Sequence, residues 1–201
     1  MNHRGGYRAH KDDVIKAHRE ALVKAAQASP FVVFLCGPTL KEGSSEPSAL
    51  LRQSLMDKLE AEGFDVVLGE DDGLEEARLN LGLNAQDNEL EFICRRCNAV
   101  IVIASSVGAF CELGLFSWHF VHEDGFIGKG SNTAFIVLVD RRYQGYRSYL
   151  NEGPVAAVEA FGQAHFVDFS AYSCDEILRR LRNRRSILTI ERRGRPRARS
   201  E

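Results

Sequence analysis

One carboxylate stands where the surrounding residues predict a core position. Glu112 lies in the segment SVGAFCELG (106–114), which follows the apolar run AVIVIA (99–104). An apolar run, two serines, a glycine and a second apolar stretch predict a buried strand, a turn and a helix with Glu112 in its first turns. A carboxylate in apolar surroundings can act as a nucleophile or as a general acid or base. It can also be structural, because the helix dipole favours acidic side chains near a helix N-terminus.

Small or polar residues follow three of the predicted strands. They are Cys36-Gly37-Pro38-Thr39, Gly69-Glu70-Asp71-Asp72 and Ser105-Ser106-Val107-Gly108. In an open parallel sheet, ligands bind beyond the carboxyl ends of the strands, near the point where the strand order reverses. Free backbone N–H groups at the start of the helix after Ser106 favour an anion, and the Ser106 hydroxyl adds a donor. The sequence therefore predicts a ligand site at this edge of the sheet.

These segments resemble the nucleoside 2-deoxyribosyltransferase family, with its 2′-deoxynucleoside 5′-monophosphate N-hydrolases. The segment 106–114 is similar to the family's element in which a small polar or acidic residue and a glycine precede Glu-Leu-Gly. FVVFLCGPTL (31–40) is similar to its first strand and loop, and DNELEFICRRCNAVIVI (87–103) to the helix leading into its central strand. AFIVLV (134–139) takes the place of the next strand. The segment 106–114 is the specific part of this resemblance.

The resemblance implies an N-glycosidase, either a hydrolase or a deoxyribosyltransferase, with Glu112 as the nucleophile. The carboxylate would attack the anomeric carbon as the base departs, and water or a second base would resolve the glycosyl-enzyme. Cys36, Gly37 and Pro38 would bind the substrate, with the loop shaped against base or sugar, and Gly108 would let the backbone approach the ligand. The family needs no metal or other cofactor, so we expect none.

Two further positions bear on the substrate and on proton transfer. Family members that act on free nucleosides carry Asp where this chain has Ser106, whereas the branch that hydrolyses 5′-monophosphates carries Ser. A carboxylate would repel a phosphate, so Ser106 favours a phosphorylated substrate, although a simple helix cap explains it equally well. The family's acidic partner corresponds to Asp87, Glu89 or Glu91. Glu89 is our first choice, and a solvated helix face is the alternative for each.

The other reactive residues predict no separate site. Cys94 and Cys97 form a lone C-x-x-C, without the second pair or the histidines that a structural zinc site needs. The acidic loop GEDDG (69–73) is more typical of a solvated loop than of a metal site. The segment RRYQGYRSY (141–149) is expected to be a polar surface loop, with closure over a nucleotide as the alternative.

The elements that position these residues alternate between apolar runs and amphipathic stretches. This alternation predicts an α/β protein: a single doubly wound, flavodoxin-like, five-stranded and mostly parallel sheet with helices on both faces. We expect strands at 31–36, 64–68, 99–104, 134–140 and 165–169, an amphipathic first helix at 11–29 and a last helix at 173–185. The predicted divisions are an N-terminal helical extension (1–30), a deoxyribosyltransferase-like α/β domain (31–187) and a basic disordered tail (188–201).

Composition limits the partners. The chain of 201 residues is 44% hydrophobic and 27% charged, with a formal net charge of −2, which gives no general attraction to nucleic acid or to an anionic membrane. No apolar run is long enough to span a bilayer and the N-terminus lacks a secretory signal, so we expect a cytoplasmic protein. A small nucleotide or nucleoside is the expected partner. The apolar helix after Ser106 predicts a homodimer or larger homo-oligomer.

Two other functions remain open at this point. An NAD-cleaving enzyme of the TIR-like type also uses a Glu on a similar sheet to break a glycosidic bond. A catalytically inactive nucleotide-sensing module would keep the fold and bind the ligand without turnover. Release of nicotinamide would identify the first, and binding without base release the second.

Overall fold

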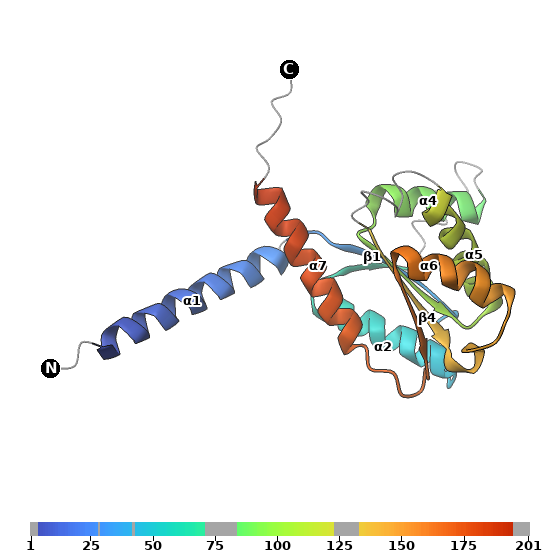
Figure 1. The fold of residues 1–201 in the computed structure, drawn as a ribbon, viewed down its shortest axis with the longest axis horizontal. Coiled ribbons are helices and arrows are strands. Elements are labelled where there is room, and N and C mark those ends of the chain that lie inside the picture. Colours follow the sequence, from blue (N-terminus) through green and yellow to red (C-terminus); the bar gives the residue numbers. More distant parts are fainter. Residues whose placement is uncertain (1–3, 28, 42, 71–83, 123–132, 195–201) are drawn as a thin grey trace, which may run out of the picture. The chain divides into compact units, whose positions relative to one another are not determined.

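A five-stranded parallel sheet forms the centre of the chain (Figure 1). The structure, a computed structural model, describes residues 4–27, 29–41, 43–70, 84–122 and 133–194. The strands lie in the order β2-β1-β3-β4-β5, and every pairing among them is parallel. Their bounds are β1 Val32–Cys36, β2 Asp65–Val67, β3 Ala99–Ala104, β4 Ala134–Asp140 and β5 Gln163–Val167. The predicted flavodoxin-like α/β fold is confirmed.

Helices connect the strands on the two faces of the sheet. They are α2 Pro47–Ala61, α4 Ala85–Arg96, α5 Val107–His122 and α6 Ala156–Phe161, with a 3-10 turn η1 Arg141–Tyr143 and a π-helical turn η2 Asn151–Val155. β3 is buried along its whole length, and alternate residues of the central strands point to opposite faces. One layer of the core joins Phe34, Val100 and Val102 to Leu113 and Phe116 of α5. A parallel sheet covered on both faces explains why its strands read as continuous apolar runs.

The fifth strand lies two residues earlier than its apolar pattern predicts. The prediction placed it at 165–169, whereas β5 covers Gln163–Val167 and pairs Ile136 with Gln163 at its start. A Cβ on Gly162, the residue before the strand, would lie 2.5 Å from the carbonyl oxygen of Phe135. That close approach lets the chain enter beside β4 at Gly162. The edge strand β5 is half-buried and begins with a polar residue, so the apolar pattern of the sequence did not mark its start.

The chain divides into two compact units. Residues 31–176 form the sheet unit, and residues 1–30 and 177–201 form a second unit, here called the terminal unit. The helix α1 covers Arg4–Gln27, earlier than its predicted start, and the last helix α7 covers Asp175–Gly194. The part 188–194 of the predicted disordered tail is therefore helical, and 195–201 lie outside the described residues.

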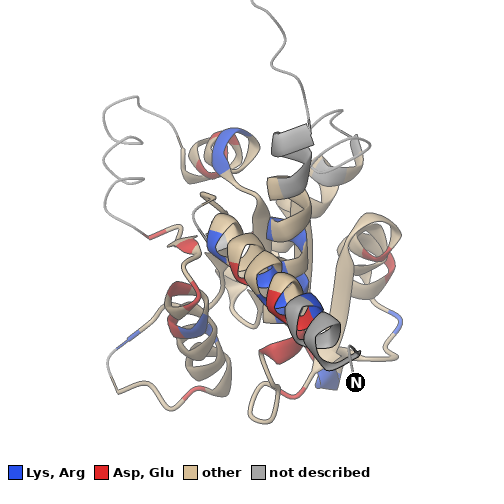
Figure 2. Ribbon diagram, turned by 90° about the vertical axis from the view of Figure 1, so that its left-hand side faces the viewer, with Lys and Arg blue, Asp and Glu red and all other residues tan. Residues whose placement is uncertain are grey.

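The first helix does not bury its predicted apolar side. Each described side chain from 11 to 24 is exposed, including Val14 at 55% and Leu22 at 37%. Figure 2 shows basic positions recurring along this helix, with fewer acidic ones between them. In the same unit the Thr189 hydroxyl donates to that of Ser29 over 3.1 Å. Within the described residues, no helix is long and apolar enough to cross a membrane.

Candidate active site

The strand order reverses at the carboxyl ends of β1 and β3. These two strands are neighbours, pairing Val33 with Ala99 through to Cys36 with Val102. From β1 the chain continues to β2, which lies next to β1 towards one edge of the sheet. From β3 it continues to β4, which lies next to β3 towards the opposite edge. The loops therefore diverge at this point, which is where open α/β sheets bind ligands. Cys36 ends β1, and Ser106 and Glu112 follow β3, as the sequence predicted.

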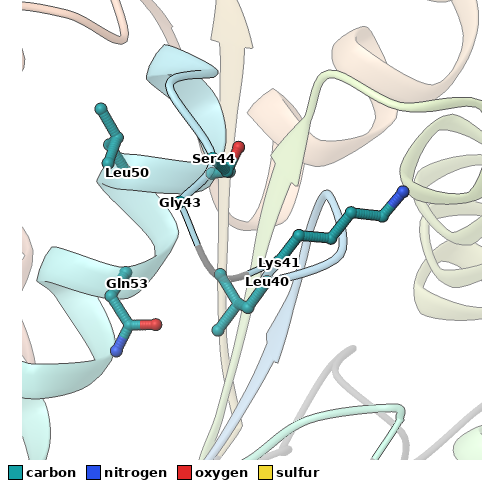
Figure 3. Close-up of a pocket in the computed structure, with 7 residues that line it drawn as sticks. Leu40, Lys41, Gly43, Ser44, Leu50 and Gln53 are labelled. Atoms are coloured by element: carbon teal, nitrogen blue, oxygen red, sulfur yellow. The ribbon is translucent and has the colours of Figure 1, made fainter.

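The loop after β1 borders a small cavity of its own (Figure 3). The cavity has a volume of about 280 Å³ and lies between four loop residues and three residues of α2, namely Leu40, Lys41, Gly43 and Ser44, and Ala49, Leu50 and Gln53. Figure 3 shows the Lys41 side chain extending away from Leu50 and Gln53. None of the predicted site residues lines this cavity.

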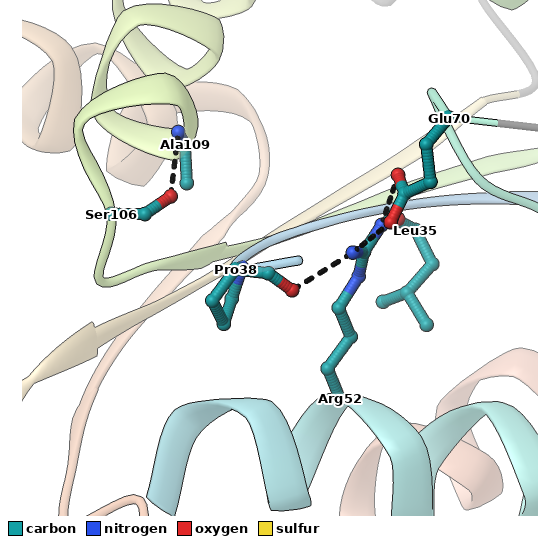
Figure 4. A network of polar contacts seen from close by, with 6 residues as sticks. All are labelled: Leu35, Pro38, Arg52, Glu70, Ser106 and Ala109. Carbon is teal, nitrogen blue, oxygen red and sulfur yellow. Dashed lines mark hydrogen bonds and ion pairs between the residues drawn. The ribbon is translucent and has the colours of Figure 1, made fainter. Parts of the chain in front are cut away.

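A buried arginine holds the loop after β1 in place (Figure 4). Arg52 of α2 is 1% exposed, and its Nη1 donates to the carbonyl of Pro38 at 2.9 Å. Its Nη2 donates to the carbonyl of Leu35 at 2.7 Å. Both nitrogens also contact the carboxylate of Glu70, at 2.6 and 3.0 Å. This fork-shaped ion pair ties together the ends of β1 and β2 and the helix between them.

Sequence reasoning missed Arg52, although the sequence carries a signal for it. Ser48, Arg52, Leu55 and Leu59 are all buried and follow one another at helical spacing on one side of α2. An arginine inside such a stripe needs acidic or carbonyl partners. Those partners come from two segments, residues 35–38 and Glu70, that no local pattern connects to Arg52.

Gly37 has a structural role that differs from the predicted one. The sequence predicts that Gly37 and Pro38 shape the loop against base or sugar. In the structure, a Cβ on Gly37 would lie 3.1 Å from Cδ of Arg52 and 3.3 Å from Cβ of Ile103. Gly37 therefore makes room for Arg52, and Pro38 supplies a carbonyl to it. Substrate binding by either residue stays a prediction.

Glu112 combines partial burial with an unpaired oxygen. Its Oε2 is buried and has no hydrogen-bond partner, while the thiol of Cys36 hydrogen-bonds to the carboxylate. Burial raises the pKa of Glu112 above its ordinary value, Arg52 opposes this rise and Glu70 adds to it. Burial and then the Glu112 charge raise the pKa of the Cys36 thiol, so that the thiol stays protonated as a donor. An unpaired buried carboxylate oxygen costs free energy of folding, which functional sites tolerate more often than structural ones.

Of the three acidic candidates on α4, Glu89 is the one that interacts with Glu112. Burial, then the charges of Glu112 and Glu70, raise the pKa of Glu89 to about 7. A Cβ on Gly69, after β2, would lie 2.8 Å from Oε1 of Glu89, so the glycine leaves space for this carboxylate. The other two candidates have local partners on exposed positions. Asp87 accepts from the Asn84 side chain, and Glu91 pairs with Arg95 one turn later.

Ser106 caps the helix that carries Glu112. Its Oγ accepts from the backbone N–H of Ala109 at 3.2 Å, and its carbonyl accepts from Phe110. The cap explanation is therefore correct, and the hydroxyl hydrogen remains available as a donor because a hydroxyl both donates and accepts. Gly108 lies one turn before Glu112, and a Cβ there would have no protein atom within 4 Å. Side-chain packing does not require this glycine, and its role in the approach of a ligand stays a prediction.

The loop after β4 is fixed by its own contacts. The Tyr143 ring packs edge-on against Phe110 of α5 with centroids 5.8 Å apart, and Arg142 lies 4.9 Å from the Tyr143 centroid. Nδ2 of Asn151 donates to the carbonyls of Tyr143 and Tyr146, each at 2.7 Å. This loop also borders a cavity of about 410 Å³. The contacts tie the loop to α5, whereas closure over a nucleotide stays a prediction.

The cysteine pair and the acidic loop give no metal site among the described residues. No group of three or more His, Cys, Asp or Glu side chains in those residues could hold a metal ion. Cys97 is buried, and burial raises the pKa of its thiol to about 12. Cys94 lies on the exposed side with its sulfur 3.7 Å from Nε2 of His119. Asp71 and Asp72 lie outside the described residues, and Glu70 is held by Arg52.

The outer side of α5 remains apolar and exposed. Val107, Trp118 and Val121 are 82%, 55% and 41% exposed, while Leu113 and Phe116 on the opposite side are fully buried. An exposed apolar helix side is the feature from which the sequence predicts a homo-oligomer. The oligomeric state stays a prediction.

The profile of the family described as STM3845 retron effector protein matches residues 49–196. This chain belongs to the STM3845 retron effector family. The match includes Arg52, Glu89 and Glu112 together with α7, and it begins after Cys36, Gly37 and Pro38. Comparison with curated proteins and with solved structures gives no match.

Proposed function

We propose that the chain is an N-glycosidase that cleaves the base–sugar bond of a nucleotide or nucleoside, and that this reaction is its activity as a retron effector. The observation that carries the proposal is that Glu112 and Glu89 interact at one end of the sheet but have different neighbours. The positive charge of Arg52 lowers the pKa of Glu112, whereas each neighbouring charge raises the pKa of Glu89. Enzymes that cleave glycosidic bonds commonly use two carboxyl groups with different pKa values. The resemblance of 106–114 to the deoxyribosyltransferase element supports the same chemistry.

The difference in surroundings supports a different role for each carboxylate. Glu112 has the Arg52 charge and the Cys36 thiol to stabilise its ionised form. For Glu89 the three causes of its shift all raise the pKa, which is about 7. Near neutral pH, Glu89 therefore retains its proton for much of the time, and we assign the ionised role to Glu112, whose charge Arg52 stabilises. The charged carboxylate is suited to attack, and the protonated one to donation.

The reaction would follow a double displacement. A Glu112 oxygen bonds to the anomeric carbon while the bond from that carbon to the base nitrogen breaks, and Glu89 protonates the departing base. The product is a glycosyl ester on Glu112 and an ionised Glu89. A water molecule then attacks the same carbon, Glu89 takes its proton, and Glu112 leaves as a carboxylate. Because Oε2 of Glu112 has no hydrogen-bond partner, no hydrogen bond has to break before this oxygen attacks.

The direct test is base release from a panel of nucleosides, 5′-monophosphates and NAD, with products separated by chromatography. We expect a free base from at least one nucleoside or monophosphate, and none with the Glu112→Gln variant. Nicotinamide as the sole product would favour the NAD-cleaving alternative. Tight binding of a panel member without any base release would favour the sensing module and contradict the proposal.

The pH dependence of the reaction should identify Glu89 as the acid. The proton on Glu89 is lost as the pH rises through about 7, so kcat/KM should fall at higher pH by about tenfold per unit. At lower pH the rate should fall again as Glu112 becomes protonated. Glu89→Gln should lower the maximum and remove the alkaline limb, because an amide does not titrate. The exposed Glu91→Gln removes the same charge from the same helix and should leave the profile unchanged. An alkaline limb that persists in Glu89→Gln would assign the acid elsewhere.

Ser106 should select a 5′-monophosphate over the free nucleoside. A hydrogen bond to a charged group contributes about 1.5–3 kcal/mol, so one donor changes affinity by about ten- to a hundredfold. Because Ser106 is a helix cap, Ser106→Ala would lose the cap as well as the donor. Asp and Asn both cap helices, so Ser106→Asp and Ser106→Asn separate charge from capping. We expect Ser106→Asp to reverse the kcat/KM preference and Ser106→Asn to retain it. If the two variants have the same ratio of kcat/KM for the monophosphate and the nucleoside, Ser106 acts only as a helix cap.

A further inference from the structure

The net charge of −2 conceals two oppositely charged units. The terminal unit, residues 1–30 and 177–201, holds 16 Lys or Arg residues against 5 Asp or Glu, a formal charge of +11. The sheet unit, residues 31–176, holds 10 basic and 23 acidic residues, a formal charge of −13. A partner at the terminal unit therefore meets a strongly basic surface. The whole-chain charge is a poor guide to what such a surface attracts.

The described part of α7 places three of its arginines on exposed positions, whereas Arg185 is buried like the leucines. Leu178, Leu181 and Leu188 are buried, whereas Arg179, Arg180 and Arg182 are exposed. At these spacings the three exposed arginines lie on a different side of the helix from the three leucines. The described part of α1 adds Lys11, Lys16, Arg19 and Lys24, all on exposed positions. The basic charge thus lies on helices, at fixed spacing, in addition to the basic residues beyond Gly194.

The kind of cation points to phosphate. Residues 177–201 hold ten arginines and no lysine. Solubility alone favours neither cation, but the planar guanidinium group matches a phosphate with two parallel hydrogen bonds. The same residues include no Phe, Tyr or Trp. Helices that lie on a membrane surface pair their cations with large apolar or aromatic side chains, and the exposed side of α7 offers Ile187 alone among its described large hydrophobic residues.

We propose that the terminal unit binds the sugar–phosphate backbone of a nucleic acid, with Arg179, Arg180 and Arg182 among its phosphate contacts. This interaction goes beyond the proposed glycosidase activity and does not depend on it. It replaces the expectation from whole-chain charge that nucleic acid is no partner. Recognition through the backbone is insensitive to base sequence and sensitive to salt, because each phosphate contact releases counterions.

The test is fluorescence anisotropy of labelled oligonucleotides of about 20 residues with the full chain, at salt concentrations from about 50 to 200 mM. The probes are single-stranded DNA, its duplex, RNA of the same sequence and, in a parallel sedimentation assay, phosphatidylserine vesicles. The test variant is Arg179→Gln with Arg180→Gln and Arg182→Gln. The matched control is Lys58→Gln with Arg95→Gln and Arg96→Gln, which removes the same charge from exposed positions of the sheet unit. Glu112→Gln serves as the protein throughout if the active chain degrades a probe.

We expect binding to at least one nucleic acid, with an affinity that falls about a hundredfold over this salt range for four phosphate contacts. The test variant should bind at least about tenfold more weakly and reduce the salt slope by about three, one for each lost contact. The control variant should bind like the wild type. Three outcomes would overturn the proposal: no nucleic acid bound at the lowest salt, equal losses in the test and control variants, or binding to vesicles alone.

Discussion

Glu112→Gln should abolish base release and leave the protein at least as stable as the wild type. The amide has the volume of the carboxylate but cannot form the glycosyl ester, so kcat should fall by about 10³-fold or more. The amide oxygen can still accept from the Cys36 thiol. The substitution removes a partly buried negative charge and leaves a neutral polar atom at the position of Oε2, so the free energy of unfolding should be unchanged or slightly higher at neutral pH.

Activity and stability together distinguish a nucleophile from a structural residue. Base release measured by chromatography gives the rate, and urea unfolding followed by circular dichroism gives the stability. A structural Glu112 would predict the opposite result, in which turnover continues and the unfolding midpoint falls. The exposed Glu91→Gln variant is the control, and it should change neither quantity measurably.

Arg52→Met should have the largest effect on stability. The substitution keeps an unbranched side chain in the buried stripe of α2 but removes each donor to Leu35, Pro38 and Glu70. Removing one partner of a buried ion pair typically costs about 3–5 kcal/mol. We expect a value near the lower end, because the Glu70 side chain is 45% exposed and can be solvated. The free energy of unfolding from urea titration measures this loss directly.

The same network should also set the acidic limb of the activity profile. Arg52 opposes the rise in the pKa of Glu112, so the acidic limb should move to higher pH in whatever fraction of Arg52→Met folds. Glu70→Gln keeps an acceptor for Arg52 and removes a negative charge that raises the pKa of both Glu112 and Glu89. In the Glu70→Gln variant, both the acidic and the alkaline limb of the pH–activity profile should therefore move to lower pH. Shifts of the acidic limb in the same direction for the two variants would contradict an electrostatic role for this pair.

The sequence by itself determined the strands β1 to β4 to within one residue at each end, and it singled out the candidate nucleophile. Buried parallel strands read as continuous apolar runs, and β3 and β4 have the bounds that their runs predict. Glu112 is recognisable because a carboxylate within apolar residues after a strand contradicts its local pattern. The charge difference between the two units is also a property of the sequence, but it becomes visible once the structure groups both ends of the chain together.

Tertiary structure alone decided which residues accompany Glu112. Asp87, Glu89 and Glu91 follow one another at two-residue steps, so successive side chains point about 200° apart around α4. The packing of Asn88 and Ile93 into the interior sets the rotation of the helix, and with it the choice of Glu89. Arg52 meets partners from β1, its following loop and the end of β2, which are distant in sequence. Contacts of this kind arise from the order in which parallel strands pair, and local periodicity carries no information about that order.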